Sequence, residues 1–419
     1  MGRNDMRILF LSPTNAGYTS NNVKHNGGGW VGALASELTR LEKFSVGIAF
    51  VGSGVWNDCH DGISYFPISA NASLKSRLRR RFDPAGEEAR FLIPEVHRAI
   101  ADFKPDLIHI FGSENAFGCI VHETDIPCVI HLQGFLPACD NAKYPPGMSR
   151  EISLWAWFRH PLRSYRKHWF DSVFRQRAAR EGDIVTNCDN FFGRTAWDRD
   201  IVELYHPNAR YWYCSEMLRE EFYRDAGSWR PHDRNEFRLV SVLSTPTYKG
   251  HDLILKTAAL LKKHTDIPFR WRVFGGFDRR FWEKQTGILA CDGNVESCGV
   301  ASAETLCREL SDSDVFVHPS YIDNSPNSVC EAQLLGMPVV AANVGGVGSL
   351  IQNRVDGLLI PANDPLSLAA RIKELANDRS LGEALGSAAA KVAARRHDRA
   401  QILSDLLKCY EALTGERTK

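Results

Sequence analysis

The sequence predicts an α/β protein with two lobes, in which each lobe is a parallel β-sheet wound with helices. The first observation is an alternation of short apolar runs with segments of helical spacing in both halves of the chain. This pattern is typical of parallel strands joined by helices. The second is the length of 419 residues, because a single hydrophobic core stops growing at about 250–300 residues. Two folding units are therefore expected.

The first lobe is expected to span residues 1–223 and to begin with a buried strand at 7–13. A long polar loop follows this strand and ends in Asn26-Gly27-Gly28-Gly29-Trp30, and a helix is predicted over 31–41 from its apolar spacing. Further strands of this lobe are predicted at 45–51, 107–111, 128–132 and 184–188.

Residues 224–236 are polar, contain Gly and Pro and lack periodicity, so they predict a linker. The second lobe is expected at 237–398, and a C-terminal helix within 399–419 is expected to pack back toward the first lobe. Strands are predicted at 237–243, 269–274, 315–318, 339–342 and 357–360, and helices at 252–263, 303–310, 328–335, 366–375 and 399–413.

The composition is that of an ordinary soluble protein, with 44% hydrophobic and 24% charged residues. The formal charge of +1 gives no global reason to bind nucleic acid. Eleven scattered cysteines without a Cys-x-x-Cys pair favour reduced thiols in a cytoplasmic protein. The polar N-terminus predicts no secretory signal, and no apolar run approaches the about 18 residues needed to cross a bilayer.

Two loops follow strands in a way that suits phosphate binding. Gly27 to Gly29 would let backbone N–H groups approach a phosphate, although a flexible surface loop is the alternative. The glycines are contiguous and far from the strand, which disfavours a nicotinamide site. Lys249 lies at a strand-to-helix turn and could reach a diphosphate; alone it would be read as a surface lysine.

The stretch 318–346 predicts a β-α-β unit, and ligands of such units sit beyond the carboxyl ends of the strands. Asp323 and Glu331 lie on either side of the expected helix start, where N–H groups favour an anion. Glu331 is either a ribose ligand or a structural cap, and the sequence favours neither. His131 ends a predicted strand, so it either points into a cleft or is a half-buried structural histidine.

Two Asp-x-Asp pairs, Asp312/Asp314 and Asp198/Asp200, could in principle hold Mg²⁺ or Mn²⁺. The first pair is expected at the amino end of a strand, far from the ligand edge of the sheet. The second is expected in a helix, where residues i and i+2 do not share a face. Neither is expected to bind a metal.

Basic and aromatic residues are concentrated in 74–82 and 154–180. Such segments can lie against anionic lipid headgroups. Stacking on nucleic acid is a competing use, but no recognisable nucleic-acid module is present. Solvated helices with their aromatic residues turned to the core are an equally good interpretation.

Together these features resemble the retaining glycosyltransferases of family 4, whose GT-B fold consists of two Rossmann-like lobes with parallel sheets facing a central cleft. The resemblance is strongest in the acid-x7-acid spacing of Asp323 and Glu331, followed by Ala332-Gln-Leu-Leu-Gly336-Met-Pro338-Val-Val-Ala341. The segments 193–198, 208–211 and 218–223 resemble a bacterial polysaccharide subgroup. Two departures are an Asp at the first acidic position and hydroxyl residues, Ser244 and Thr245, where the family has an arginine.

The resemblance implies a role for each matching position. Glu331 would bind the nucleotide ribose, Asp323 would lie near the donor sugar, Lys249 would neutralise the diphosphate, and His131 would lie near the transferred sugar. These four form the expected catalytic set. The expected donor-binding residues are Gly28, Gly29, Ser244, Thr245, Gly275, Val300, Asn324, Ser325 and Ser328.

The implied activity is transfer of a sugar from a nucleotide-diphosphate donor to a hydroxyl of a glycan or lipid-linked acceptor, with retention and without metal or cofactor. The expected setting is cell-surface polysaccharide synthesis, in the cytoplasm or peripherally at the inner face of the plasma membrane, with an anionic membrane surface as a further partner. Nucleic acid is not an expected partner. The departures leave open a catalytically weak binding or scaffold subunit, and a phosphorylase or epimerase of the same fold is a third hypothesis.

Overall fold

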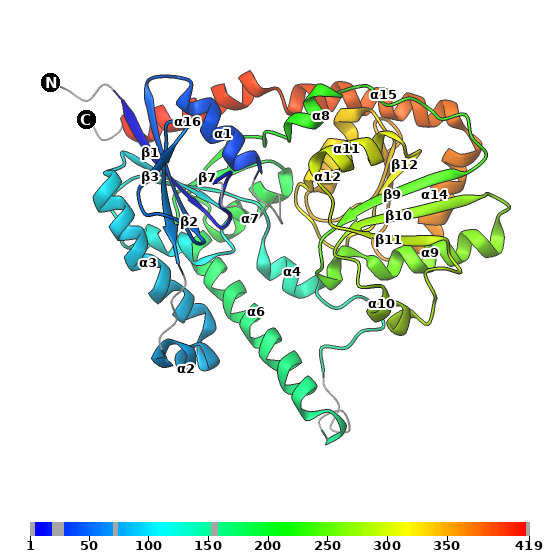
Figure 1. The fold of residues 1–419 in the computed structure, drawn as a ribbon, viewed down its shortest axis with the longest axis horizontal. Coiled ribbons are helices and arrows are strands. Elements are labelled where there is room, and N and C mark those ends of the chain that lie inside the picture. Colours follow the sequence, from blue (N-terminus) through cyan, green and yellow to red (C-terminus); the bar gives the residue numbers. More distant parts are fainter. Residues whose placement is uncertain (1–4, 19–28, 70–73, 152–157, 416–419) are drawn as a thin grey trace. The chain divides into compact units, whose positions relative to one another are not determined.

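The computed structural model describes residues 5–18, 29–69, 74–151 and 158–415 (Figure 1). Contacts divide the chain into two compact units. The first unit comprises Met1–Asp140, Ser149–Met217 and Arg399–Lys419, and the second comprises Asn141–Met148 and Leu218–Asp398. Residues 218–236 thus make their contacts with the second unit: Trp229, for example, is buried there and its Nε1 donates to the Ser313 carbonyl at 2.8 Å.

The first unit contains an eight-stranded sheet with the order β3-β4-β2-β1-β5-β6-β7-β8. Its pairs are parallel except β3 with β4. The parallel arrangement agrees with the prediction from buried apolar runs, since parallel strands are covered by helices on both faces. The strands are β1 Met6–Ser12, β2 Phe44–Val51, β3 Asp58–His60, β4 Ile63–Ile68, β5 Leu107–Phe111, β6 Cys128–His131, β7 Asn190–Gly193 and β8 Arg210–Tyr213.

Helices cover this sheet through two separate hydrophobic clusters, one that includes residues of α1 and α16 and one that includes residues of α3 and α6. In α16, Tyr410 is buried, and its Oη lies 2.6 Å from Nδ1 of His109 on β5. The helical elements are α1 Gly29–Thr39, α2 Leu74–Phe82, α3 Pro84–Phe103, η1 Ala116–His122, α4 Leu136–Ala142, α6 Pro161–Asn187, α7 Ala196–Tyr205 and α16 Arg399–Gly415.

The strand predicted at 184–188 is wrong. Residues 184–187 form the last turn of α6, and the strand β7 begins only at Asn190. Ile184 and Val185 are fully buried in the helix-covered core. A short buried apolar run is compatible with the end of a helix and with a strand, so periodicity alone does not distinguish the two.

The second unit contains a six-stranded parallel sheet with the order β11-β10-β9-β12-β13-β14. From β9 the chain adds β10 and β11 on one side of the sheet, and it then adds β12, β13 and β14 on the other side of β9. Parallel sheets bind ligands where the strand order reverses in this way, at the carboxyl ends. The strands are β9 Phe237–Leu243, β10 Phe269–Gly275, β11 Val295–Gly299, β12 Val315–His318, β13 Val339–Ala342 and β14 Leu358–Ile360.

The helices of the second unit follow its strands in the expected alternation. Five of them, namely α8, η2, α10, α13 and the long α15, were not among the predicted elements. The helical elements are α8 Glu220–Arg224, η2 Thr247–Lys249, α9 His251–His264, α10 Arg279–Thr286, α11 Ala303–Ser311, α12 Asn327–Leu335, α13 Val347–Leu350, α14 Pro365–Asn377 and α15 Arg379–Arg396.

Two further expectations from composition concern thiols and membrane spans. All eleven cysteines lie within the described residues, and none of them forms a disulfide bond. Within the same residues, no helix combines the length and the apolarity that crossing a bilayer requires.

Candidate functional site

The loops at the reversal point of the second sheet are held together by two glycines. Gly250, between η2 and α9, has φ of +78°, and a Cβ there would lie 2.1 Å from the Pro319 carbonyl oxygen. Gly345, after β13, has φ of +50°, and a Cβ there would lie 2.1 Å from the Asp323 carbonyl oxygen. Only glycine permits both the backbone conformation and the approach. The loops after β9, β12 and β13 therefore meet main chain to main chain.

Lys249 and Asp323 are brought together at this point. Lys249 ends η2, Asp323 lies in the loop after β12, and Nζ is 2.7 Å from Oδ2 of the carboxylate. Nε2 of His318, the last residue of β12, lies 3.0 Å from the same oxygen. The other oxygen accepts a hydrogen bond of 3.2 Å from the Asn324 N–H. The two residues predicted from sequence thus form one cluster, to which the structure adds His318.

The Asp323 carboxyl is ionised in this cluster. Burial by itself would raise its pKa, but the Lys249 ammonium and the hydrogen bond from His318 outweigh burial and hold the pKa well below the usual range. The Lys249 ammonium is consequently already partnered by a carboxylate. An anionic ligand that uses Lys249 has to share it with Asp323.

Glu331 has a partner that sequence reasoning missed. It lies on α12 with 2% of its surface exposed. Arg219 donates from Nε to Oε1 and from its Nη2 nitrogen to Oε2, each at 2.6 Å. A buried glutamate requires such a partner. The apolar neighbours of Glu331 in the sequence indicate that it needs a partner. They do not indicate that the partner is an arginine 112 positions away.

The predicted residues Asn324, Ser325 and Ser328 lie where the chain enters α12. Asn324 and Ser325 are buried, and Ser328 Oγ donates to the Val242 carbonyl at 3.5 Å. Pro326, which precedes the helix, makes no side-chain cap hydrogen bond. The positive end of the α12 dipole therefore lies in the same loop region as Lys249 and Asp323.

The other predicted donor-binding residues of this unit lie at the same edge of the sheet. Ser244 and Thr245 follow β9 and are exposed. Gly275 ends β10 with φ of +96°, and a Cβ there would lie 2.1 Å from the Leu243 carbonyl oxygen. Val300 follows β11 and is 65% exposed. This edge thus offers exposed hydroxyls, which can donate hydrogen bonds but carry no positive charge.

His131, Gly28 and Gly29 belong to the first unit. Gly28 lies outside the described residues, and Gly29 is the exposed first residue of α1. His131 is fully buried at the end of β6, rather than half-buried. Its ring lies parallel to that of His109 at 5.5 Å between centroids and edge-on to Trp30 at 5.0 Å.

The His131 ring is neutral. Burial lowers its pKa well below the usual value, and the nearby His109 and Arg194 lower it further. Burial likewise lowers the pKa of His109 to about 3. A neutral imidazole keeps one N–H donor and one acceptor, so His131 is suited to hydrogen bonding with hydroxyls rather than to supplying a counter-charge.

Three carboxylates of the two Asp-x-Asp pairs, those of Asp312, Asp314 and Asp198, make structural contacts. Asp314 accepts from the Arg238 N–H at 2.7 Å, and Asp312 forms ion pairs with Arg234 and Arg238. Asp198 forms a capping box at the start of α7. Among the residues that the structure describes, no group of three or more His, Cys, Asp or Glu residues could hold a metal ion.

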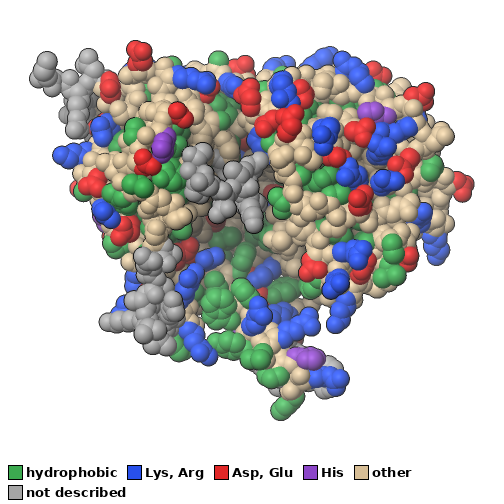
Figure 2. Space-filling model, in the orientation of Figure 1, with side chains coloured by type: hydrophobic (Ala, Val, Ile, Leu, Met, Phe, Trp, Pro, Cys, Tyr) green, Lys and Arg blue, Asp and Glu red, His purple; other side chains and the backbone are tan. Residues whose placement is uncertain are grey.

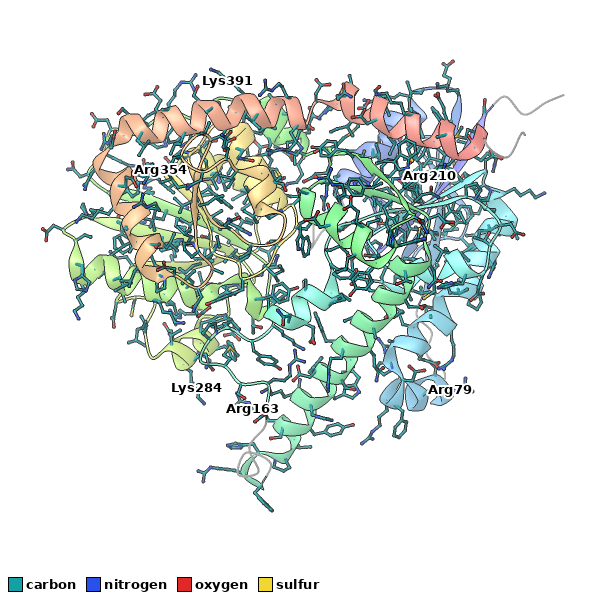
Figure 3. The ribbon with its side chains drawn as sticks, turned by 180° about the vertical axis from the view of Figure 1, so that it is seen from behind. Arg79, Arg163, Arg210, Lys284, Arg354 and Lys391 are labelled. Carbon is teal, nitrogen blue, oxygen red and sulfur yellow. The ribbon has the colours of Figure 1, made fainter. Side chains whose placement is uncertain are left out.

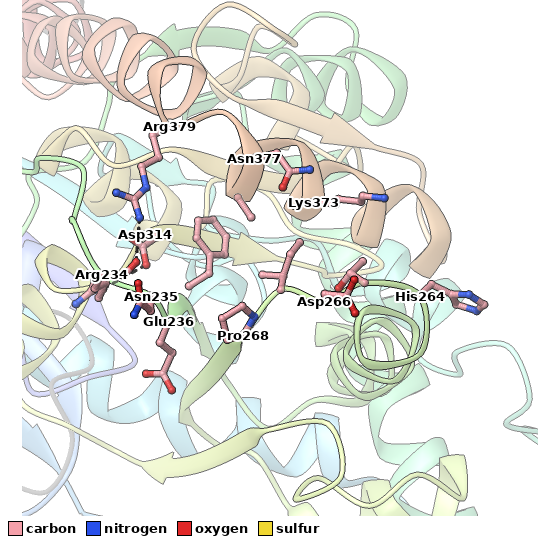
Figure 4. Close-up of a pocket in the computed structure, with 14 residues that line it drawn as sticks. Arg234, Asn235, Glu236, His264, Asp266, Pro268, Asp314, Lys373, Asn377 and Arg379 are labelled. Atoms are coloured by element: carbon pink, nitrogen blue, oxygen red, sulfur yellow. Dashed lines mark hydrogen bonds and ion pairs between the residues drawn. The ribbon is translucent and has the colours of Figure 1, made fainter.

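A cavity of about 470 Å³ lies elsewhere in the second unit (Figure 4). It is lined by residues at the amino ends of the strands, including Phe237 at the start of β9 and Asp314 just before β12. Arg379, which also lines it, donates to the Arg234 carbonyl at 2.9 Å. Because parallel sheets bind ligands at the other end, we do not assign this cavity to the candidate site.

Comparison with known proteins finds a family similarity within the second unit. Residues 229–392 match the family described as glycosyl transferases group 1. This segment contains Lys249, His318, Asp323 and Glu331, but not Arg219.

Two curated relatives illustrate the extent of the similarity. The amylovoran biosynthesis glycosyltransferase AmsK of Erwinia amylovora is 30% identical over 157 residues, which are 35% of this chain and 37% of AmsK. A D-inositol 3-phosphate glycosyltransferase of Thermobispora bispora is 36% identical over 250 residues, which are 52% of this chain and 55% of that protein. The chain thus matches about a third to about a half of the length of these relatives.

The structural similarity extends further than the sequence similarity. The solved structure of HepE from Anabaena, in complex with UDP-glucose, matches 97% of this chain and 100% of its own chain with a TM-score of 0.65 and 16% identity. At this identity the likeness shows the fold, which is the predicted GT-B fold of two parallel-sheet α/β lobes. Residues 229–392 of this chain are therefore similar to the glycosyl transferases group 1 family, and the fold is GT-B.

Proposed function

We propose that this protein transfers a sugar from a nucleotide-diphosphate donor to a hydroxyl group of an acceptor, with retention of the anomeric configuration. The observation that carries the proposal is the cluster of Lys249, Asp323 and His318 where the second sheet reverses its strand order. The match of residues 229–392 to a glycosyltransferase family supports it.

The chemical demand of such a reaction is to stabilise negative charge on the departing diphosphate. Preorganised positive groups in a water-poor site do this without reorganisation at the moment of reaction. Lys249 and the N-terminal end of α12 are suited to this role, and Asp323 holds the Lys249 ammonium in place. In the proposed reaction no metal takes part, since these fixed groups supply the charge.

The remaining site residues would position the two ends of the donor. Glu331 is proposed to accept hydrogen bonds from the ribose hydroxyls, with Arg219 fixing its carboxylate, and His131 to bond a hydroxyl of the transferred sugar. HepE, the structural neighbour, was solved with UDP-glucose, which favours a uridine nucleotide as the first donor to test.

The acceptor is proposed to be a glycan or lipid-linked hydroxyl in cell-surface polysaccharide synthesis. The relative AmsK is described as an amylovoran biosynthesis glycosyltransferase, and this supports the proposal. The proposed location is the cytoplasm, with peripheral contact to the inner face of the plasma membrane.

A screen of UDP-, GDP- and ADP-sugars by calorimetry, followed by transfer assays with membrane extract, tests this function. One nucleotide sugar is expected to bind and to be consumed in the presence of extract, and proton NMR of the product is expected to show the anomeric configuration of the donor. An inverted product would exclude retention. Consumption that depends on inorganic phosphate or on water alone would instead indicate a phosphorylase or an epimerase.

A second candidate is a binding or scaffold subunit without turnover. It is favoured by two internal pairings, since Lys249 is held by Asp323 and Glu331 by Arg219. Binding of a nucleotide sugar with no transfer in any membrane extract would select this candidate over the enzyme.

A further inference from the structure

The first half of α6 has an unusual distribution of polar and apolar side chains. The residues that it buries are Ser164 and Asp171, both polar. Leu162 is 80% exposed and Phe170 is 54% exposed, and Phe158, just before the helix, is 86% exposed. Folding normally buries the apolar side chains of a helix and exposes the polar ones. Here the arrangement is reversed.

Apolar residues of this half of the helix form a stripe along one face. Leu162 and Tyr165, which are exposed, and Trp169, which is partly buried, are spaced i, i+3 and i+7. Asp171 follows Leu162 by nine positions, which at about 100° per residue puts it on the opposite face. The buried polar face therefore faces the protein, and the apolar stripe faces away from it.

The second half of the same helix is packed in the ordinary way. Ala178, Ile184 and Val185 are buried. Arg177 and Arg180 bind Glu88 of α3 at 3.1 and 3.0 Å. The helix is thus anchored at its C-terminal half, so the exposed stripe is a property of residues 158–170 and not of a loosely attached helix.

Positive charge surrounds the apolar stripe. Residues 158–170 contain Arg159, Arg163, Arg166 and Lys167 and no Asp or Glu. The end of α2 adds Arg79, Arg80 and Arg81, all exposed, and Phe82, which is 79% exposed. Figure 3 labels Arg79 on α2 and Arg163 near the beginning of α6.

The end of α2 and the first half of α6 form one surface. The Arg81 guanidinium lies over the ring of Tyr165, at 5.5 Å from its centroid. Figure 2 shows hydrophobic and Lys/Arg side chains gathered in the lower part of the view, where α6 begins, with few acidic side chains among them. We call residues 79–82 and 158–170 the α2–α6 surface.

We propose that the α2–α6 surface lies on a lipid bilayer with anionic headgroups. Leucine and aromatic side chains would enter the boundary between headgroups and acyl chains, while the arginines bind lipid phosphates. A nucleic acid would complement the charge but would leave Leu162 and Phe158 in water. The proposal deepens the proposed function, because it would place the first unit at the source of a lipid-linked acceptor, yet its test requires no turnover.

Co-sedimentation of the full chain with vesicles tests the proposal. Vesicles of phosphatidylcholine containing about a third phosphatidylglycerol are expected to bind the protein at least tenfold more tightly than pure phosphatidylcholine. Binding is expected to weaken as salt rises, because charge screening acts on the headgroup contacts. Equal affinity for both vesicles, or no binding to either, would overturn the proposal.

Two sets of variants locate the binding surface. The triple variant Phe158→Ser, Leu162→Ser, Phe170→Ser and the double variant Arg163→Glu, Arg166→Glu are each expected to lose at least tenfold in vesicle affinity. Matched controls change equally exposed residues of the same unit, Leu204→Ser on α7 and Arg199→Glu on α7, and are expected to bind normally. All changed residues are exposed, so folding is expected to be retained, which circular dichroism checks.

The outcomes separate this proposal from the proposed function. Unchanged vesicle binding in both sets of variants would overturn the α2–α6 surface as the membrane contact, whatever the enzymatic result. Binding of a single-stranded RNA oligonucleotide that excludes vesicles and depends on the same residues would also overturn it. If vesicles bind as predicted but no nucleotide sugar is bound, the proposed function fails and the membrane surface stands.

Discussion

Arg219 donates two hydrogen bonds of 2.6 Å to the two carboxylate oxygens of Glu331. The guanidinium also lies over the ring of Phe222, 4.9 Å from its centroid. The pair joins the segment before α8 to the middle of α12, and Glu331 is almost entirely buried beneath it. The carboxylate orientation that a ribose would meet is therefore set by Arg219.

Removing Arg219 is expected to destabilise the protein. Arg219→Ala leaves the Glu331 carboxylate buried without its counter-charge, which costs about 3 kcal/mol in the free energy of unfolding. Urea denaturation measures the change. The control is Arg224→Ala, an exposed arginine paired with Asp225 and with exposed Glu304, which is expected to cost much less because surface ion pairs contribute little to stability. Equal losses of unfolding free energy in the two variants would show that the Arg219–Glu331 ion pair contributes no more to stability than an exposed ion pair does.

Neutralising Glu331 is expected to weaken nucleotide binding. Glu331→Gln keeps the shape of the side chain but loses acceptor strength toward ribose hydroxyls, so the dissociation constant of the nucleotide is expected to rise at least tenfold. Calorimetry with the nucleotide alone provides the measurement. The control is Glu304→Gln, an exposed glutamate on α11. Unchanged nucleotide affinity in Glu331→Gln would remove the ribose role.

Lys249 is expected to act mainly on the rate. Lys249→Met removes the positive charge near the departing diphosphate and is expected to lower kcat by a factor of about 10²–10³, the usual range for one stabilising donor. Lys263→Met, an exposed lysine near the end of α9, is the matched control and is expected to retain activity. A Lys249→Met enzyme with normal kcat would contradict the assignment of Lys249.

The stability of the protein is expected to depend on pH through Glu181, which is fully buried on α6. Burial, and next the charge of Glu114, raises the pKa of Glu181 to about 8, against the hydrogen bonds from Ser113 and the Leu136 N–H. Between the unfolded pKa near 4.5 and the folded value, the folded state holds the extra proton. Stability from this group is therefore complete at low pH and lost as pH rises toward 8, by up to about 1.4 kcal/mol per pH unit.

The variant Glu181→Gln, which stays neutral, is expected to flatten this dependence between pH 5 and 8. Thermal or urea unfolding at several pH values measures it. Glu203→Gln, an exposed glutamate on α7, is expected to keep the original slope. A slope that is the same in the native protein and in Glu181→Gln would place the titration elsewhere.

The second unit was predicted more accurately than the first, for a physical reason. The strands β12 and β13 are buried throughout, and β9 is buried at its centre, at residues 239–241. The predicted bounds of all three strands agree with the structure. The strand β11 was missed because it exposes Glu296 and Ser297 at the edge of the sheet. Its sequence therefore lacks the apolar pattern on which the prediction rests.

In the candidate site, the positions of residues along the strands could be predicted from the sequence, but several of their side-chain contacts could not. The positions of Lys249 and Asp323 at the carboxyl ends of β9 and β12 followed from motif and topology, and the structure brings the two side chains together. The contacts of Glu331 with Arg219 and of Asp323 with His318 depend on side-chain directions. Those directions arise from packing between elements far apart in the chain, which sequence spacing does not encode.

The contact between Tyr410 and His109 has a consequence for shortened forms of this protein. A chain ended at residue 398 would keep the whole matched segment 229–392 and every strand of both sheets. It would nevertheless lose the phenol that lies against the His109 imidazole, on which the His131 ring is stacked. Although α16 follows the matched segment in the sequence, it packs in the first unit, and a shortened form without it would lose part of the core around His109.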